Sequence, residues 1–376
     1  MLKALFWGST GLLLYTHAGY PLLLRALAGP PRPEADREDR SPHELPSVSL
    51  IVAAHDEEDV IAAKVLGALA LDYPRERLQV VVASDGSGDR TAERAREAGA
   101  HLVLELPRGG KIRAQDRAVE EADGEILAFS DANSTWAPDA LRRLVAPFAA
   151  DERTGYVCGQ VRFVSDGGTN QEGLYWRYEM AVRELESRTA GVTAGNGAIY
   201  AVRREAYLVV DPRMGHDLSF PFNLVKRGWR SLYAPDARAE EKMVPSIEGE
   251  FARKRRMMSH AWAIVLEGGL LSPRGYPAPY ALEILSHRVL RYASPFLHLA
   301  ALASSAALRR RGRVYAAALV AQLGLLGAAA LGPMVSLRPF RLAYYYVLVT
   351  ASLAAGLLDH LRTGTPAEWE KAEGTR

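Results

Sequence analysis

The sequence predicts an α/β domain with a parallel sheet, joined to membrane helices at both of its ends. Two observations carry this prediction. Apolar strand-like runs alternate with helix-like segments from residue 47 to residue 130, an order typical of a parallel sheet with helices on both faces. Long stretches without a formal charge lie before this region and after residue 291, and their length suits a bilayer.

The composition narrows the possible functions. The chain has 376 residues, of which 48% are hydrophobic and 24% charged, enough for one large core. Its 46 basic and 44 acidic residues give a net charge of +2, so we expect no nucleic acid among its partners. Cys158 has no second cysteine to pair with. It fits core packing in a reducing compartment.

The N-terminal segment is expected to be an uncleaved membrane anchor. Residues 4–24 carry no formal charge, and a span needs about 20 residues. A signal peptide would have a shorter apolar region and a small-residue cleavage site. The basic residues that follow place the next segment in the cytoplasm by the positive-inside rule. We assign residues 1–27 to this anchor and the proline-rich residues 28–46 to a linker.

Strands and helices alternate in the central part of the chain. Asp56 is a plausible N-cap of the first helix, and acidic residues suit the positive end of a helix. Glycine is expected to close the second helix. The predicted strands cover residues 47–54, 78–84, 101–105 and 125–130, and the predicted helices cover residues 56–71, 89–99 and 111–122.

Polar side chains follow three of these strands. The runs are His55–Glu58, Asp85–Thr91 and Asp131–Asn133. One such run alone is an ordinary helix cap or turn. Because ligands bind outside the carboxyl ends of the strands in open α/β sheets, three runs at one sheet edge indicate a site, and paired oxygens there can hold a hard cation. The glycine fingerprint of dinucleotide-binding proteins and the phosphate loop are both absent from the sequence.

Six motifs follow one another in the chain. They read VAAHDEE (52–58), ASDGSGDRT (83–91), GK (110–111) with Asp116, FSDAN (129–133), GNGAIYA (195–201), and HD (216–217) followed by RGWR (227–230). This ordered set resembles that of family 2 glycosyltransferases, which have a GT-A catalytic domain attached to membrane helices. Singly the motifs are weak, but as an ordered set they are specific, and they cover residues 47 to about 256.

The resemblance implies a donor site. Glu57 and Asp85 would contact the nucleoside, Asp85 by accepting the base N–H. Lys111 would approach the diphosphate, although a solvated lysine at a helix start is the alternative. Asp131 and Asn133 would bind the diphosphate through Mg or Mn. The family usually has a second carboxylate where this chain has Asn133, so a weaker metal affinity is expected.

The resemblance also implies a catalytic base and an acceptor loop. Asp217 would be the base, with His216 in place of the usual glutamate; His216 either tunes the pKa of Asp217 or is only a spacer. Capping of a helix is the alternative role of Asp217. Gly195, Asn196 and Gly197 would let an acceptor sugar approach the backbone, or form a plain turn.

An amphipathic segment follows the GT-A domain. We place the domain at residues 47–245 and the interfacial segment at residues 246–288. Arg253 and Arg256 resemble the basic part of a Gln-x-x-Arg-Trp motif that binds the diphosphate in processive relatives. The missing Gln and Trp favour transfer of one or a few sugars. A helix lying on an anionic membrane surface is the alternative.

The C-terminal region, residues 289–360, contains two or three membrane helices before a polar tail at residues 361–376. The uncharged stretches are residues 292–308, 314–337 and 342–358. Three spans would put the C-terminus outside and would also place the basic run Arg309–Arg313 outside, against the positive-inside rule. If residues 292–308 are interfacial or re-entrant, the tail is cytoplasmic. The resemblance favours three spans.

The expected protein is a membrane-bound inverting glycosyltransferase of the bacterial inner membrane, with a cytoplasmic catalytic domain. It would transfer a hexosyl or N-acetylhexosaminyl group from a nucleotide sugar, preferably a UDP-sugar, to a lipid-linked or polysaccharide acceptor. Two alternatives remain: a nucleotide-sugar-binding scaffold subunit of a glycan-synthesis complex, and a sugar nucleotidyltransferase. The acidic residues after the first strand disfavour the nucleotidyltransferase.

Overall fold

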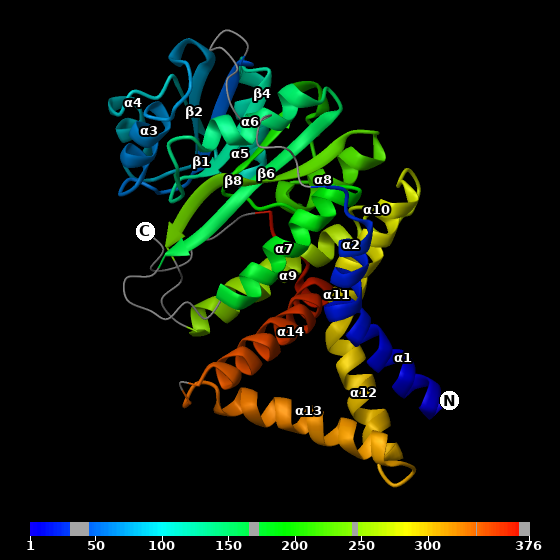
Figure 1. Ribbon diagram of the computed structural model, residues 1–376. Coiled ribbons are helices and arrows are strands. Elements are labelled where there is room, and N and C mark those ends of the chain that lie inside the picture. The colour runs from blue at the N-terminus through cyan, green and yellow to red at the C-terminus, as the bar shows by residue number, and fades with distance from the viewer. Residues whose placement is uncertain (31–44, 165–172, 243–246, 336, 368–376) are drawn as a thin grey trace.

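The protein consists of a sheet domain above a set of long helices, as the computed structural model in Figure 1 shows. The structure describes residues 1–30, 45–164, 173–242, 247–335 and 337–367. Most of the predicted linker and of the polar tail therefore lies outside the described residues.

The sheet has eight strands in the order β3-β2-β1-β4-β7-β6-β8-β5. Its first four strands are parallel neighbours, as predicted. The rest of the sheet, for which no strands were predicted, is mixed. β7 runs antiparallel to both β4 and β6, and β5 antiparallel to β8, whereas β6 and β8 pair in parallel. The strands are β1 (Val48–Ala54), β2 (Leu78–Asp85), β3 (Leu102–Leu106), β4 (Ile126–Asp131), β5 (Thr135–Trp136), β6 (Thr154–Val164), β7 (Tyr200–Arg203) and β8 (Arg230–Lys242).

Helices cover both faces of this sheet, because alternate residues of each buried strand point to opposite sides. Leu50 packs with α6 on one face, and Ile51 packs with α5 and α8 on the other. The helices of this domain are α3 (Ile61–Leu69), α4 (Thr91–Glu97), α5 (Lys111–Glu121), α6 (Ala140–Ala150), α7 (Gly173–Thr189) and α8 (His216–Lys226), with single 3₁₀ turns at Arg75–Arg77 and Arg204–Ala206.

The first predicted helix begins later than expected. It starts at Ile61 and not at residue 56, and Val60 is its N-cap. Asp56 has a φ of +49°, which no helix allows. Its amide and carboxylate are bonded to Ser87 and Gly88 in the loop after β2. Tertiary hydrogen bonds therefore replace the capping role that the sequence suggested for Asp56.

The remaining helices form the lower part of the molecule in Figure 1. The N-terminal helix is continuous over α1 (Leu2–Leu14), a π-helical turn η1 (Tyr15–Gly19) and α2 (Tyr20–Leu27). The C-terminal helices are α9 (Ile247–Leu266), α10 (Ala278–Glu283), a π-helical turn η6 (Ile284–Val289), α11 (Leu290–Tyr292), α12 (Ser294–Leu308), α13 (Arg313–Leu331) and α14 (Arg338–Thr363).

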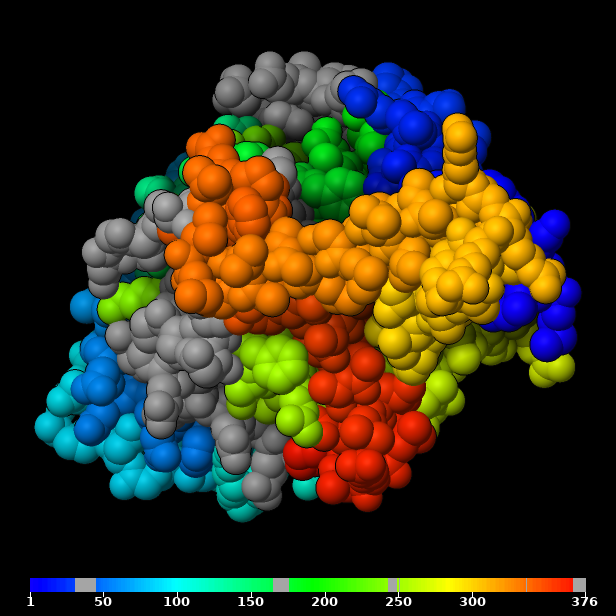
Figure 2. All heavy atoms as spheres, turned by 90° about the horizontal axis from the view of Figure 1, so that it is seen from below, coloured from blue at the N-terminus to red at the C-terminus, as the bar shows by residue number. Residues whose placement is uncertain are grey.

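These lower helices pack in pairs. Helix α1 lies along α12, and the rings of Phe6 and Tyr315 meet with their centroids 4.8 Å apart. Helix α14 lies along α9. Helix α13 runs across the far end of the molecule, seen from below in Figure 2. Among the described helices, α13 and α14 are long and apolar enough to cross a membrane, whereas α12 is shorter.

Candidate active site

The loops that follow β1 and β2 hold each other at the sheet edge. The Gly88 amide donates to Oδ1 of Asp56 at 2.7 Å, and the Glu57 amide donates to Oγ1 of Thr91 at 2.7 Å. The Glu58 amide donates to Asp89. Glu57 itself is only 2% exposed. Two of the predicted polar runs are thus joined into one rigid edge.

Asp85 fixes the loop that precedes α5. It is 1% exposed, and its carboxylate accepts hydrogen bonds from the amides of Gly109 at 2.7 Å and Gly110 at 3.0 Å. The Arg108 guanidinium pairs with it at 3.0 Å. The carboxylate that was expected to meet a base is therefore aimed at its own chain, where it sets the position of Lys111 at the start of α5.

Lys111 and Asp131 meet at the centre of this edge. Nζ of Lys111 forms an ion pair with Oδ1 of Asp131, which is the last residue of β4. A side chain at Gly197 would come within 3.2 Å of Nζ of Lys111 and 3.8 Å of Oδ2 of Asp131. Glycine at this position therefore leaves space beside the pair.

Two ionisable residues that the sequence analysis did not single out lie close to Asp131. Lys64 on α3 is 8% exposed and donates to the carbonyl oxygen of Ser134 at 2.7 Å. Burial lowers the pKa of Lys64 to about 7, although Asp131 and Glu241 act in the opposite direction. Burial and the charge of Asp131 raise the pKa of Glu241 to about 7. Asn133 and Glu241 line one cavity of about 450 Å³.

The predicted acceptor loop lies next to Asp217. The Gly195 amide donates to the Asp217 carbonyl oxygen at 2.7 Å. The Asn196 side chain shapes the loop, because its amide group donates to Gly159 at 2.7 Å and its oxygen accepts from Ile199 at 2.9 Å. The two glycines differ: a side chain at Gly195 would meet the protein's own Tyr156, whereas Gly197 faces Lys111 and Asp131.

Asp217 lies in the first turn of α8, after the N-cap Gly215. Because Gly215 is the N-cap, Asp217 does not occupy the capping position that the sequence left open as an alternative. A side chain at Gly215 would lie 2.6 Å from Oδ1 of Asp217. Tyr200 lies within electrostatic range of both Asp131 and Asp217. The charges of the predicted base and of the predicted metal ligand therefore both act on the buried Tyr200 hydroxyl.

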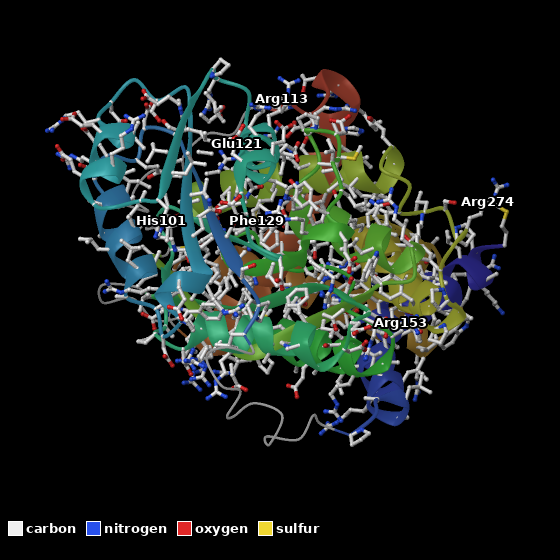
Figure 3. All side chains as sticks on the ribbon, turned by 90° about the horizontal axis from the view of Figure 1, so that it is seen from above. His101, Arg113, Glu121, Phe129, Arg153 and Arg274 are labelled. Carbon is white, nitrogen blue, oxygen red and sulfur yellow. The ribbon has the colours of Figure 1, made fainter. Side chains whose placement is uncertain are left out.

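His216 is a core residue. It is 2% exposed, and its ring contacts Phe129, Tyr207 and Phe220. Figure 3 shows Phe129 in the interior of the sheet domain. Nδ1 of His216 lies 2.9 Å from Oη of Tyr200, and burial lowers the pKa of His216 to about 3. A neutral imidazole supplies no positive charge to its neighbour Asp217.

The two basic residues predicted on α9 have different surroundings. Arg253 lies over the ring of Phe163, 5.7 Å from its centroid. It is also within electrostatic range of Glu241, a residue that lines the same cavity as Asn133. Arg256 is half-buried on the same helix. The neighbouring Arg255 pairs with Asp359 on α14 and so faces away from the sheet edge.

The residues at this edge fit a divalent cation that is shared with a ligand. In the part of the chain that the structure describes, no group of three or more His, Cys, Asp or Glu side chains could hold a metal ion by itself. However, the space beside Asp131 that Gly197 leaves open admits a ligand, and carboxylate and amide oxygens are what Mg²⁺ and Mn²⁺ accept. Diphosphate oxygens would complete such a site.

Comparison with known proteins gives one family and several relatives. The model of the family described as "Glycosyltransferase like family 2" matches residues 46–259. An N-acetylglucosaminyltransferase of Rhizobium meliloti is 30% identical over 216 residues, 51% of this chain and 50% of that protein. A beta-monoglucosyldiacylglycerol synthase of Trichormus variabilis is 35% identical over 178 residues, 43% of this chain and 36% of that protein.

One solved structure is similar over nearly the whole chain. It is the mannosyltransferase PcManGT from Pyrobaculum calidifontis in complex with GDP-Man and Mn²⁺, with a TM-score of 0.70 and 25% identity. The match covers 96% of this chain and 99% of that one. By contrast, this chain spans only about a third to a half of the length of the curated relatives.

Proposed function

Since this chain belongs to the glycosyltransferase-like family 2, we propose that it is a membrane-bound inverting enzyme that transfers one or a few sugars. The donor is a nucleotide sugar, preferably a UDP-sugar, and the sugar is a hexose or an N-acetylhexosamine. The acceptor is lipid-linked or a polysaccharide. Transfer takes place at the cytoplasmic face of the bacterial inner membrane.

One observation carries this proposal. Gly197 lies beside the Lys111–Asp131 pair, and Gly195 of the same loop is bonded to Asp217. Lys111 can pair with a diphosphate, and Asp131 can hold a metal ion that binds the diphosphate. The loop beside this pair is also bonded to Asp217, a carboxylate that can accept a proton. Donor cleavage and acceptor activation require these two groups at one site.

The reaction follows from the roles of these groups. Asp217 takes the proton of an acceptor hydroxyl, whose oxygen attacks the anomeric carbon of the sugar from the side opposite to the diphosphate. The bond from this carbon to the diphosphate oxygen breaks, and the electron pair leaves with the nucleotide. Lys111 stabilises the developing negative charge. A cation held by Asp131 and Asn133, when bound, supplies further charge neutralisation to the leaving diphosphate.

The other predicted donor residues surround this centre. Glu57 follows β1, the strand beside β4, and Asp85 ends β2, the next strand along the sheet. Both would border the nucleoside, Asp85 either directly or through the loop that it holds. Arg253 and Arg256 would approach the diphosphate from α9. The curated relatives named as synthases of glycolipid and polysaccharide support a membrane-associated acceptor.

The division into an anchor (1–27), a GT-A domain (47–245), an interfacial segment (246–288) and C-terminal helices (289–360) is part of this proposal. The apolar helices α13 and α14 support membrane attachment. Arg25, Arg32, Arg37 and Arg40 follow the uncharged N-terminal stretch and support a cytoplasmic sheet domain, because the positive-inside rule counts basic residues and not net charge.

The decisive experiment measures release of nucleoside diphosphate by the detergent-purified chain from a panel of UDP- and GDP-sugars, with Mg or Mn and native lipid extract as acceptor. Asp217→Asn is expected to lower acceptor-dependent release by about 10² to 10⁴-fold while nucleotide binding persists. If every donor binds and none turns over with the wild-type chain, the scaffold alternative replaces the enzyme.

A further inference from the structure

Two arginines hold the loop next to Asp217. Arg183 on α7 donates to the carbonyl oxygen of Gly195 at 3.0 Å. Nε of Arg288 in the π-helical turn η6 donates to Oγ1 of Thr193 at 2.9 Å. The Gly195 amide donates to the carbonyl oxygen of Asp217, so both guanidinium groups are bonded to the loop that contacts the proposed base.

Neither guanidinium has a carboxylate partner within 4 Å in the part of the chain that the structure describes. This is unusual for Arg183, which is 8% exposed. It donates to Gly195 and to the sulfur of Met180 and lies over the ring of Tyr233, while Glu179 acts on it without forming an ion pair among the described residues. A buried guanidinium without an anion is costly unless a ligand supplies the anion.

The carboxylates of the surrounding helices are already engaged. Glu186 accepts from Tyr20, Thr193 and His287, and Glu179 pairs with Arg291. Burial and the nearby Glu186 raise the pKa of Glu283 to about 10, so this carboxyl group is neutral. Glu186 places a negative charge near Arg288, and Glu179 places one near Arg183. Both carboxylates are bonded to other groups, and neither is an ion-pair partner of these two arginines among the described residues.

The helix that carries Arg288 leads to an apolar cavity. After η6 and α11, the chain continues into α12, whose Pro295, Leu299 and Leu302 line a cavity of about 220 Å³ together with residues of α13 and α14. Tyr292 lies between Arg288 and Pro295 in the chain, within electrostatic range of Arg288 and Asp217. Figure 1 shows this run of helix descending from the sheet domain.

We infer that Arg183 and Arg288 bind the phosphate group of an amphiphilic acceptor, whose neighbouring hydroxyl is the group that Asp217 deprotonates. This inference rests on the proposed glycosyl transfer and names its acceptor class. Paired guanidinium groups match the geometry of phosphate oxygens. The apolar cavity along α12 accommodates part of the hydrocarbon chain. The phosphate is not the nucleophile: the attacking hydroxyl loses its proton to Asp217, and the nucleotide leaves as before.

The test separates native lipids by charge. A lipid extract of native membranes is split by anion exchange into neutral and anionic fractions, and each fraction is incorporated into phosphatidylcholine vesicles with the full chain. A third arm supplies the water-soluble anions of the same cells. Transfer of labelled sugar is measured with wild type, Arg288→Gln and Arg288→Lys. Arg310→Gln, an exposed arginine in the turn after α12, is the matched control.

We expect transfer to the anionic lipid fraction. Arg288→Gln should raise the KM for this acceptor by about 10- to 100-fold with a smaller change in kcat, because a charge-assisted contact is lost. Arg288→Lys should recover part of the affinity, and Arg310→Gln should match wild type. A purely structural role of Arg288 predicts instead that kcat and thermal stability fall together and that KM does not change.

Three results would overturn the inference. Transfer to lipids of the neutral fraction that contain no phosphorus excludes phosphate recognition, and an unchanged KM in Arg288→Gln excludes Arg288. Transfer only to soluble anions keeps the phosphate contact but excludes the amphiphile. Donor hydrolysis without acceptor is recorded in parallel, because its presence preserves the proposed glycosyl transfer even when the acceptor class is wrong, whereas its absence together with absent transfer rejects both.

Discussion

His216 occupies the position next to the proposed base, yet it belongs to the core by every physical measure. Its ring is enclosed by aromatic side chains, and its Nδ1 faces the Tyr200 hydroxyl. Its buried Nε2 has no hydrogen-bond partner among the residues that the structure describes. Desolvation disfavours the imidazolium, and the positive charge of Lys111 adds to this effect. The histidine therefore holds the start of α8 in place without changing charge at neutral pH.

This burial predicts a dependence of stability on pH. The pKa of His216 falls from its ordinary value of 6.5 to about 3 in the folded protein, so the unfolded chain binds more protons between these values. As the pH falls below 6.5, this group should lower the free energy of unfolding by about 1.4 kcal/mol per pH unit. In His216→Gln, which keeps an acceptor for Tyr200, thermal unfolding between pH 7.5 and 4.5 should show a flatter decline. Parallel curves for the two proteins would contradict this assignment.

The two glycines of the acceptor loop are expected to respond differently to substitution. In Gly195→Ala the new Cβ would lie 1.9 Å from Oη of Tyr156, so the free energy of unfolding should fall by about 1–3 kcal/mol. In Gly197→Ala the nearest atom is the mobile end of Lys111, so stability should be kept while the affinity for the nucleotide sugar falls. Thermal unfolding and nucleotide binding measure the two effects.

A double substitution checks the cause of the first effect. In the described part of the chain, the buried Tyr156 hydroxyl has no hydrogen-bond partner, so Tyr156→Phe alone should cost little stability. Combined with Gly195→Ala, it should restore part of the lost stability. If Gly195→Ala is as stable as wild type, the contact with Tyr156 does not explain this glycine.

At the scale of elements, α9 and α14 connect the sheet domain to the apolar helices. They approach closely at Gly356, where a Cβ would lie 2.6 Å from Cβ of Met258 and 2.8 Å from the backbone of Ser259. The Trp262 indole donates to the carbonyl oxygen of Leu353 at 2.8 Å one turn away. Gly356 thus allows α14 to contact the backbone of α9. This contact fixes the position of α9, the helix that carries Arg253 and Arg256.

Gly356→Val should therefore separate α14 from α9. We expect the free energy of unfolding in detergent to decrease by about 1–3 kcal/mol, because the nearest atoms are Cβ of Met258 and backbone atoms, which cannot rotate away. Gly327→Val on α13 is the matched control, since nothing lies within 4 Å of its Cβ position. Equal stability of the two variants would show that the α9–α14 contact is not tight.

At the scale of the whole molecule, the C-terminal helices return to the sheet domain. Helix α12 leads away from it, α13 crosses the far end, and α14 comes back (Figure 1). Thr365, just after α14, is 5% exposed and hydrogen-bonds to Ser259 on α9 at 2.9 Å. His260, the next residue of α9, faces the carbonyl oxygen of Arg213 in the sheet domain. Of the two arrangements that the sequence left open, this path agrees with a tail on the side of the catalytic domain.

This path can be tested by cysteine labelling in sealed membrane vesicles. Cys158 is buried and is the single cysteine of the sequence, so a Cys158→Ser background is suitable. The exposed residues Arg153 and Arg362 are replaced one at a time by cysteine. Both should react with an impermeant maleimide from the same side. Labelling of position 362 only from the opposite side would require α14 to end across the membrane.

Much of the central domain follows from local patterns. The four strands predicted from apolar runs agree with β1 to β4 within one residue at each end, because a buried parallel strand is apolar along its whole length. β6 and β8 were not predicted. Both are long, and their outer halves alternate between buried and exposed residues, so they lack the continuous apolar run of a central strand.

The sequence by itself determined the family, the order of the motifs, and the placement of Asp131 and Lys111 at a sheet edge and a helix start. These features depend on residue type and short spacing. Only the tertiary structure decided that Asp56 serves the neighbouring loop, that His216 is neutral, and that Lys64 and Glu241 lie near Asp131. It also brought Arg288 to a loop almost a hundred residues earlier in the chain. The physical reason is that burial and charge pairing depend on neighbours distant in sequence, which no local pattern specifies.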